Sequence, residues 1–111
     1  MSKPVRQRPQ ALIDFMAIAD FLHETSPDAS LKFIGAVESA YALLSEHPGS
    51  GSMRHASVLP ELPVPLRFHP VQGFPRVLIY YLDLPEAVEV IRLWDAARGL
   101  DALIEDSEEP S

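Results

Sequence analysis

The sequence predicts an α+β fold, a two-layer sandwich in which a helical hairpin covers one face of an antiparallel sheet. Apolar residues recur at helical spacing through the first half of the chain, between residues 10 and 46. Three apolar β-type runs follow, and the turns between them are too short for a parallel crossover. The chain has 111 residues, of which 47 % are apolar, so we expect one domain with one modest core.

The first segments predict a strand and a helix. "SKPVRQRP" suits a short edge strand, because Pro4 and Pro9 limit its pairing. A helix is expected from about Gln10 to His23. Its apolar stripe consists of Leu12, Phe15, Ala19 and Leu22, widened by Met16 and Ile18. The acids between them are expected to face solvent, namely Asp14, Asp20 and Glu24.

A second helix is expected from Pro27 to Glu46. Ser26 is a good N-cap, Pro27 suits the first helical position, and no helix continues through His47-Pro48. The short break between the two helices predicts an antiparallel hairpin. Gly35 lies inside the second helix, where we expect it to permit close approach of the first.

The second half predicts a loop, a sheet and a short helix. A loop rich in Pro, Gly and Ser leads to the runs "PLRFHPV", "RVLIYYLD" and "AVEVIRLW". The last apolar segment, "ARGLDALI", has helical spacing and predicts a short closing helix. We therefore expect a single domain over residues 1–104 and an acidic disordered tail over residues 105–111.

Strand alternation suggests a binding site on an open face of the sheet. Alternation places Val88, Val90, Arg92 and Trp94 on one face of the last strand, opposite Glu89, Ile91 and Leu93. If the helices cover the Leu66 and Phe68 side, Arg67 and His69 point to the open face. Arg92 would join them to bind an anion or a carboxylate, with Trp94 as an apolar wall. The alternative is that these arginines pair with local acids, such as Glu89, Asp95 or Asp101.

The sequence contains little that indicates another catalytic site or a metal site. Tyr80 and Tyr81 face opposite sides of their strand, and we favour core packing for them over a general-base role. The four histidines are not spaced as metal ligands, and there is no cysteine, so no metal and no cofactor is expected. The serines of the loop lack a nucleophile elbow, and its glycines are not followed by a helix.

Charge and hydropathy argue against nucleic acid and membrane as partners. The formal net charge is -7, and residues 9–50 contain six acids but one base, Lys32. A nucleic-acid-binding protein usually carries a basic surface, so tight direct binding of nucleic acid is not expected. No apolar run approaches the ~20 residues of a membrane span, and the basic start lacks the apolar core of a signal peptide. A cytoplasmic protein is therefore expected.

Four landmarks recur in order along the chain. They are the Ser-Pro start of the second helix, the break of "HPGSG", the Leu-Arg of "LRFHPV" and the closing Arg-x-x-x-x-x-Arg-x-Leu of "VEVIRLWDAARGLDALI". With these landmarks the chain resembles, from about Val5 to Ile104, the ParE branch of the ParE/RelE toxin superfamily of bacterial toxin–antitoxin systems. The resemblance implies a RelE/ParE-like fold and a toxin that a cognate, ParD-like antitoxin wraps.

The resemblance implies two alternative targets. ParE members imply DNA gyrase, and RelE members imply mRNA in the ribosomal A site, cut by clustered basic residues and a tyrosine. Arg67, Arg92 and Arg98 match the family's arginines, and a nuclease would use them with Tyr80 or Tyr81. For a toxin that acts by binding, the expected contacts to target or antitoxin are Arg67, His69, Arg92, Trp94, Asp95 and Arg98.

Asp95 departs from the family pattern and favours the first target. Relatives commonly show His-Gly-Ala-Arg where this chain reads Asp95-Ala96-Ala97-Arg98. A carboxylate cannot replace an imidazole as a base near neutral pH, and it would repel RNA phosphate. It would instead cap the closing helix or hold Arg98. We therefore favour a gyrase inhibitor without catalysis of its own over a RelE-like mRNA endonuclease or a degenerate, non-toxic member that still binds antitoxin.

Overall fold

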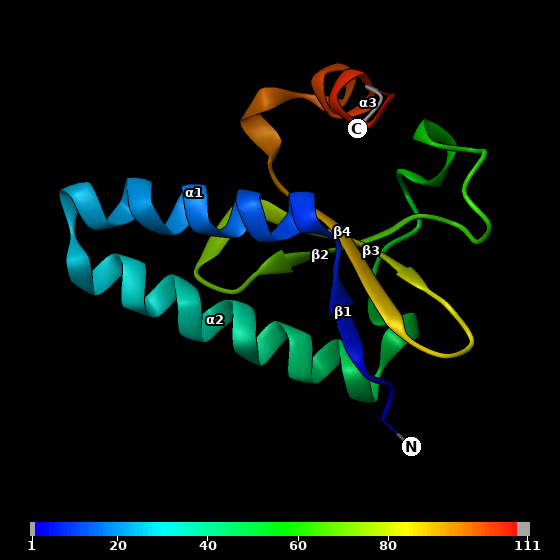
Figure 1. The fold of residues 1–111 in the computed structure, drawn as a ribbon, viewed down its shortest axis with the longest axis horizontal. Helices are drawn as coiled ribbons and strands as arrows, with labels where there is room; N and C mark the ends of the chain where they lie inside the picture. Colours follow the sequence, from blue (N-terminus) through cyan, green and yellow to red (C-terminus); the bar gives the residue numbers. More distant parts are fainter. Residues whose placement is uncertain (1, 109–111) are drawn as a thin grey trace.

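The protein folds as a helical hairpin packed on a mixed sheet, as the computed structural model of residues 2–108 shows (Figure 1). The helices and strands, in chain order, are β1 (Val5–Gln7), α1 (Pro9–Thr25), α2 (Pro27–Glu46), β2 (Arg67–Val71), β3 (Phe74–Asp83), β4 (Val88–Asp95) and α3 (Leu100–Glu108). This confirms the predicted α+β class and the predicted order of elements. Three 3₁₀ turns, Pro48–Ser50, Ala56–Val58 and Ala96–Arg98, lie in the connections.

Local signals set the ends of the helical hairpin. The Ser26 hydroxyl caps α2 by accepting a 3.2 Å hydrogen bond from the Ala29 N–H. Pro27 occupies the first turn of α2, where its missing N–H costs nothing. His47 ends the same helix, directly before Pro48. The predicted role of Gly35 is wrong, because no atom lies within 4 Å of where its Cβ would be.

The sheet contains four strands in the order β1-β4-β3-β2. β2, β3 and β4 are antiparallel neighbours, as predicted. The N-terminal strand β1 pairs in parallel with β4, so it joins the same sheet, which is therefore mixed. Because β1 begins the chain and β4 nearly ends it, this pairing binds the two halves of the sequence together.

A β-bulge in β4 changes the predicted strand faces. Tyr80 pairs with Arg92, but the next residue, Tyr81, pairs with Val90, so Ile91 is the extra residue. Simple alternation placed Val90 and Trp94 on one face. In the structure Val90 packs in one hydrophobic cluster and Trp94 in the other, so that expectation is wrong.

The two faces of the sheet carry two hydrophobic clusters. The first cluster joins the sheet to the hairpin; it contains Ala11, Ala19, Phe33, Val37, Ala40, Leu44, Val71, Val77, Ile79, Tyr81, Val88, Val90 and Leu93. The second cluster lies on the opposite face; it contains Leu59, Leu66, Leu78, Tyr80, Leu82, Ile91, Trp94 and Leu103. The helical hairpin therefore does not cover the Leu66 and Phe68 side, contrary to the expectation.

The second face is covered by residues 56–66, called the strap here, and by α3. Within the strap Leu62 and Val64 pack on the second cluster, whereas Pro63 and Pro65, which each follow one of them, are exposed. Leu100 and Leu103 of α3 cover the same cluster. α3 extends to Glu108, so residues 105–108 of the predicted disordered tail are helical, and residues 109–111 lie outside the described part of the chain.

Local contacts occupy the edges of the sheet at three points. On β2, Phe68 exchanges both backbone hydrogen bonds with Ser52, at 2.9 and 3.0 Å, and Pro70 has no N–H to offer. Ahead of β1, the Lys3 N–H donates to the Ser45 carbonyl of α2 over 2.9 Å. On β4, beyond the end of β1, the Leu93 N–H donates to the Asp14 carboxylate over 3.2 Å.

Candidate functional site

Arg92, the predicted contact residue of β4, is held by a carboxylate of α1. Its Nε and Nη2 donate to the two Asp14 oxygens over 2.7 and 3.0 Å, and both side chains are at least nine-tenths buried. The predicted pairing of this arginine with an acid is right, but the acid is Asp14, which we expected in solvent. Arg92 is therefore not on an open face, and the pair attaches α1 to the end of β4.

Two of the other predicted contact residues, Arg92 and Arg98, lie against the ring of Trp94. The Trp94 ring is almost fully buried, and its Nε1 donates to the Gly99 carbonyl over 3.1 Å. The guanidinium carbons of Arg92 and Arg98 lie 4.9 and 4.0 Å from its ring centroid. The indole thus fixes the turn from β4 into α3.

Asp95 is a capping residue, but it caps the 3₁₀ turn Ala96–Arg98 and not the closing helix α3 that we expected it to cap. Its carboxylate accepts a 2.9 Å hydrogen bond from the Ala97 N–H, at the start of the 3₁₀ turn. Its ion-pair partner, 3.6 Å away, is Arg76 of β3. The alternative, that Asp95 holds Arg98, is not what the structure shows.

Arg67 and His69 lie on β2, apart from Arg92. Arg67 donates two 3.0 Å hydrogen bonds, to the carbonyls of Gly49 and Gly51. His69 is half-buried opposite Ile79 of the first cluster, and burial lowers the pKa of its imidazole. The open face that these two were expected to share with Arg92 does not exist, because they lie on the hairpin side of the sheet.

Both tyrosines of β3 are core residues with bonded hydroxyls. The Tyr81 hydroxyl donates to the Pro48 carbonyl over 2.7 Å and accepts from the Gly51 N–H over 2.9 Å. The Tyr80 hydroxyl lies 2.8 Å from the His55 Nδ1, and burial raises the pKa of Tyr80 to about 12. Neither phenol is poised to lose a proton near neutral pH.

His55 was not singled out in the sequence, although it links the loop to the second cluster. Its ring stacks on Phe68 with centroids 4.4 Å apart. Burial, followed by the charge of Arg54, lowers the pKa of its imidazole. No local pattern identifies this residue, because its partners are 13 or more positions away.

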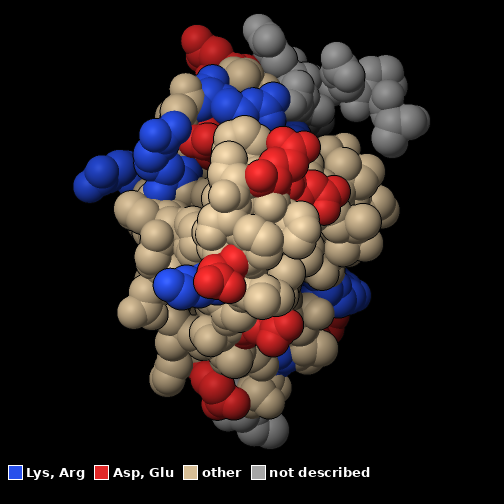
Figure 2. All heavy atoms as spheres, turned by 90° about the vertical axis from the view of Figure 1, so that its left-hand side faces the viewer, with Lys and Arg blue, Asp and Glu red and all other residues tan. Residues whose placement is uncertain are grey.

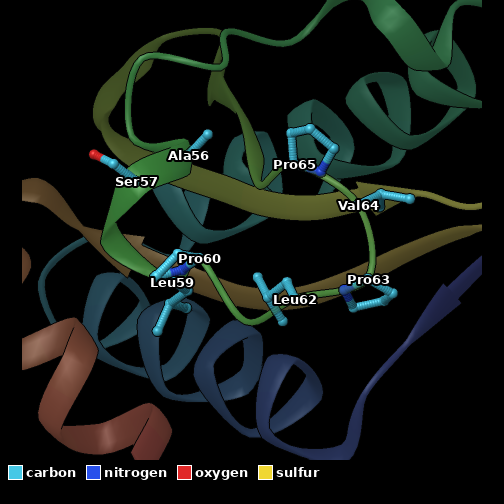
Figure 3. Close-up of a pocket in the computed structure, with 8 residues that line it drawn as sticks. All are labelled: Ala56, Ser57, Leu59, Pro60, Leu62, Pro63, Val64 and Pro65. Carbon is cyan, nitrogen blue, oxygen red and sulfur yellow. The ribbon is translucent and has the colours of Figure 1, made fainter.

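One concavity lies within the strap itself (Figure 3). It encloses about 360 Å³ and is lined by Ala56, Ser57, Leu59, Pro60, Leu62, Pro63, Val64 and Pro65. None of these side chains is an acid, a base or a good metal ligand. The concavity therefore offers apolar contact but no acid–base chemistry.

A second concavity, the α1 groove, lies between α1 and the sheet. It encloses about 340 Å³ and is lined by Ile18, Phe21, Leu22, Phe74, Pro75, Arg76, Val77 and Asp95. Phe21, on its helical wall, is 67 % exposed although it is a large apolar side chain. Exposed Ile13 and Met16 extend the apolar surface of α1. The α1 groove therefore combines an exposed apolar side chain with two charged residues, Arg76 and Asp95.

Figure 2 shows the end of the molecule where α1 turns into α2. Uncharged atoms occupy the middle of this face, acidic side chains are spread over it, and a cluster of Lys and Arg lies along its upper left border. Within residues 2–108 no group of three acids or histidines is placed to hold a metal ion. No helix in that range is long and apolar enough to cross a membrane.

Comparison with known proteins identifies relatives. Residues 5–100 match the family described as "ParE toxin of type II toxin-antitoxin system, parDE". A solved structure described as "Chromosomal ParDE TA system from P. aeruginosa" has a similar fold, with a TM-score of 0.65 and 16 % sequence identity. The similarity covers 83 % of this chain and 94 % of that one. No curated protein matches the sequence.

Proposed function

The chain belongs to the ParE toxin family of type II toxin–antitoxin systems, and from this membership we propose that it inhibits DNA gyrase by binding it. Membership in such a system implies an antitoxin partner. We propose that a cognate, ParD-like antitoxin neutralises this chain by covering a surface of the folded domain. Gyrase acts in the cytoplasm, so the proposal places this chain there as well.

The contacts of Arg67 and Arg92, two arginines that a nuclease would use, support inhibition by binding rather than by RNA cleavage. A ribosome-dependent nuclease needs free cationic groups around the scissile phosphate and a group that moves a proton. Here the Asp14 carboxylate compensates Arg92, and backbone carbonyls bind Arg67. Arg67 and Arg92 also lie two strands apart, on β2 and β4, in a sheet where β3 separates them.

The tyrosines support the same choice. A nuclease mechanism would need Tyr80 or Tyr81 near those arginines and near the substrate. Both side chains are fully buried, and burial raises the pKa of each phenol. The family match is therefore the observation that carries the proposal. The contacts of Arg67, Arg92 and the two tyrosines add that these described residues do not form a cleavage site.

The test is a supercoiling assay in which purified chain, without antitoxin, is added to gyrase and relaxed plasmid. Inhibition with accumulation of cleaved DNA is the expected result, and addition of the antitoxin should reverse it. No effect at micromolar protein would remove gyrase as the target. Sequencing of mRNA ends after expression would then separate a RelE-like endonuclease from a non-toxic member, and unimpaired growth would indicate the latter.

A further inference from the structure

We propose that the chain contacts gyrase through the strap and the turn directly before it, and that gyrase presents an apolar side chain and a carboxylate to this contact. The surface consists of Met53, Arg54 and the concavity of the strap, and it is called the strap surface here. The inference rests on the proposed function, because it takes gyrase as the partner. It adds the face of the fold that makes the contact and the chemistry that the partner must present there.

The turn at Arg54 is fixed on both sides. Before it, Ser52 exchanges both backbone hydrogen bonds with Phe68 of β2, and the Ser52 hydroxyl accepts from the Arg54 N–H over 3.1 Å. After it, the His55 ring stacks on the same Phe68, and the His55 Nδ1 lies 2.8 Å from the Tyr80 hydroxyl. These contacts hold the turn in one position, so a partner that binds it would lose little free energy in ordering it.

The side chains that this turn presents are exposed. Met53 is 50 % exposed although it is apolar, and Arg54 is exposed as well. Arg54 forms no ion pair with a described residue, whereas Arg6 and Arg76, which are also exposed, each pair with an acid. Methionine and arginine are enriched at protein interfaces, and a guanidinium binds a carboxylate through two parallel hydrogen bonds. The turn therefore presents an apolar contact and a cation beside each other.

The concavity of the strap adds an apolar anchor point next to the turn. It encloses about 360 Å³, and two residues that line it, Ala56 and Ser57, follow the turn directly in the chain. Exposed Pro60, Pro63 and Pro65 also line it, and proline fixes the backbone φ angle, so this wall is stiff. Figure 3 shows the strap in front of the strands, on the face of the sheet opposite the hairpin. An apolar side chain of a partner can enter the concavity from this side.

The charge of this part of the chain favours an acidic partner. Between Glu46 and Asp83 the sequence contains three arginines and one acid, Glu61, although the whole chain has a net charge of -7. The two helices of the hairpin contain six acids and one base, Lys32. A partner surface with carboxylates would be repelled by the hairpin and attracted by Arg54. The charges therefore direct such a partner to the strap surface.

Two variants, each with a matched control, test the inference in the gyrase supercoiling assay at several salt concentrations. Arg54→Glu reverses the charge of the turn, and its control, Lys32→Glu, reverses an exposed charge on α2. Pro63→Asp places a carboxylate on the wall of the concavity. Its control, Pro75→Asp, makes the same change at an exposed proline that lines the α1 groove. All four side chains are exposed, so each variant should fold, as circular dichroism will verify.

We expect Arg54→Glu and Pro63→Asp each to raise the concentration that halves supercoiling by about tenfold or more, and each control to change it by less than about threefold. Inhibition by the wild-type chain should weaken as salt increases, and Arg54→Glu should reduce that dependence.

Wild-type inhibition by both test variants would overturn the inference while leaving the proposed function intact. Equal losses in the test variants and their controls would overturn the location of the contact. An effect of Pro63→Asp without one of Arg54→Glu would overturn the carboxylate on gyrase. A wild-type chain that does not inhibit gyrase would refute the proposed function itself.

Discussion

The Asp14 carboxylate and the Arg92 guanidinium, 78 positions apart in the sequence, form a two-pronged buried ion pair. The same Asp14 Oδ2 also accepts the Leu93 N–H. One acid of the hairpin thereby satisfies both a side chain and a backbone donor of β4. Asp14 therefore attaches α1 to β4 through three hydrogen bonds.

Asp14→Ala should lower the free energy of unfolding by about 3–5 kcal/mol, because it leaves a buried guanidinium without its counter-charge. Asp14→Asn should cost less, since an amide oxygen still accepts one hydrogen bond. Chemical denaturation measures both values. The matched control, Asp20→Ala on the exposed side of the same helix, should change stability by less than about 0.5 kcal/mol. An Asp14→Ala variant as stable as this control would contradict the role given to the ion pair.

The function of Arg92 can be separated from its structural role with a paired substitution. Replacing a buried ion pair by apolar residues of similar size is often nearly neutral. Asp14→Leu with Arg92→Met also leaves the Leu93 N–H without its acceptor, at a cost of about 1–3 kcal/mol. The double variant should still fold and should inhibit gyrase within about threefold of wild type, since Arg92 is buried. A supercoiling assay on the refolded variant checks this. A stable double variant that no longer inhibits gyrase would make Arg92 a contact residue instead.

Three glycines should respond differently to alanine. Gly35→Ala should raise the free energy of unfolding by about 0.5–1 kcal/mol, because nothing lies near the added methyl group and alanine favours the helix. Gly51→Ala should lower it by about 1–3 kcal/mol, because the methyl group would overlap the Tyr81 ring. Gly49→Ala, whose Cβ also meets nothing, is the control for the second change. Thermal unfolding ranks all three, and equal effects of the Gly49 and Gly51 changes would refute the close contact.

Stability should fall in weakly acidic solution because of two histidines. Burial lowers the pKa of His55 and of His69 below the value near 6.5 that they have when unfolded. The unfolded chain then binds more protons below pH 6.5, so the free energy of unfolding decreases as the pH falls from 7 through this range. Denaturation at pH 8 and at pH 5.5 should show that His55→Gln loses less stability between the two than wild type. An unchanged difference would mean that His55 titrates alike in both states.

Much of the fold was accessible from local sequence signals. Ser26 and Pro27 at one end and His47-Pro48 at the other predicted α2 with its observed bounds. Turns too short for a crossover predicted the antiparallel neighbours. These predictions are correct because a cap, a proline or a short connection determines the structure of residues that are close to it in the chain.

The candidate site was harder to predict because it depends on distant partners. Asp14 was assigned to solvent as an acid on an amphipathic helix, although its spacing from Ala11 and Ile18 places it on the buried side. The bulge at Ile91 shifted alternation within β4, so half of that strand was given the wrong face. The strap was read only as a loop, because its prolines mask the alternation of Leu62, Val64 and Leu66.

The contacts that occupy backbone groups of β2 and β4 have a consequence for the protein at high concentration. Sheets grow into fibrils when a strand of one molecule finds free amide and carbonyl groups on the next. Here Asp14 occupies a backbone N–H of β4, and Ser52 occupies the backbone groups of Phe68 on β2, although neither residue belongs to one of the named strands. A second copy of the chain therefore cannot add a strand at these two positions of β2 and β4. The carboxylate that attaches α1 to β4 also removes one backbone donor that such a copy would need.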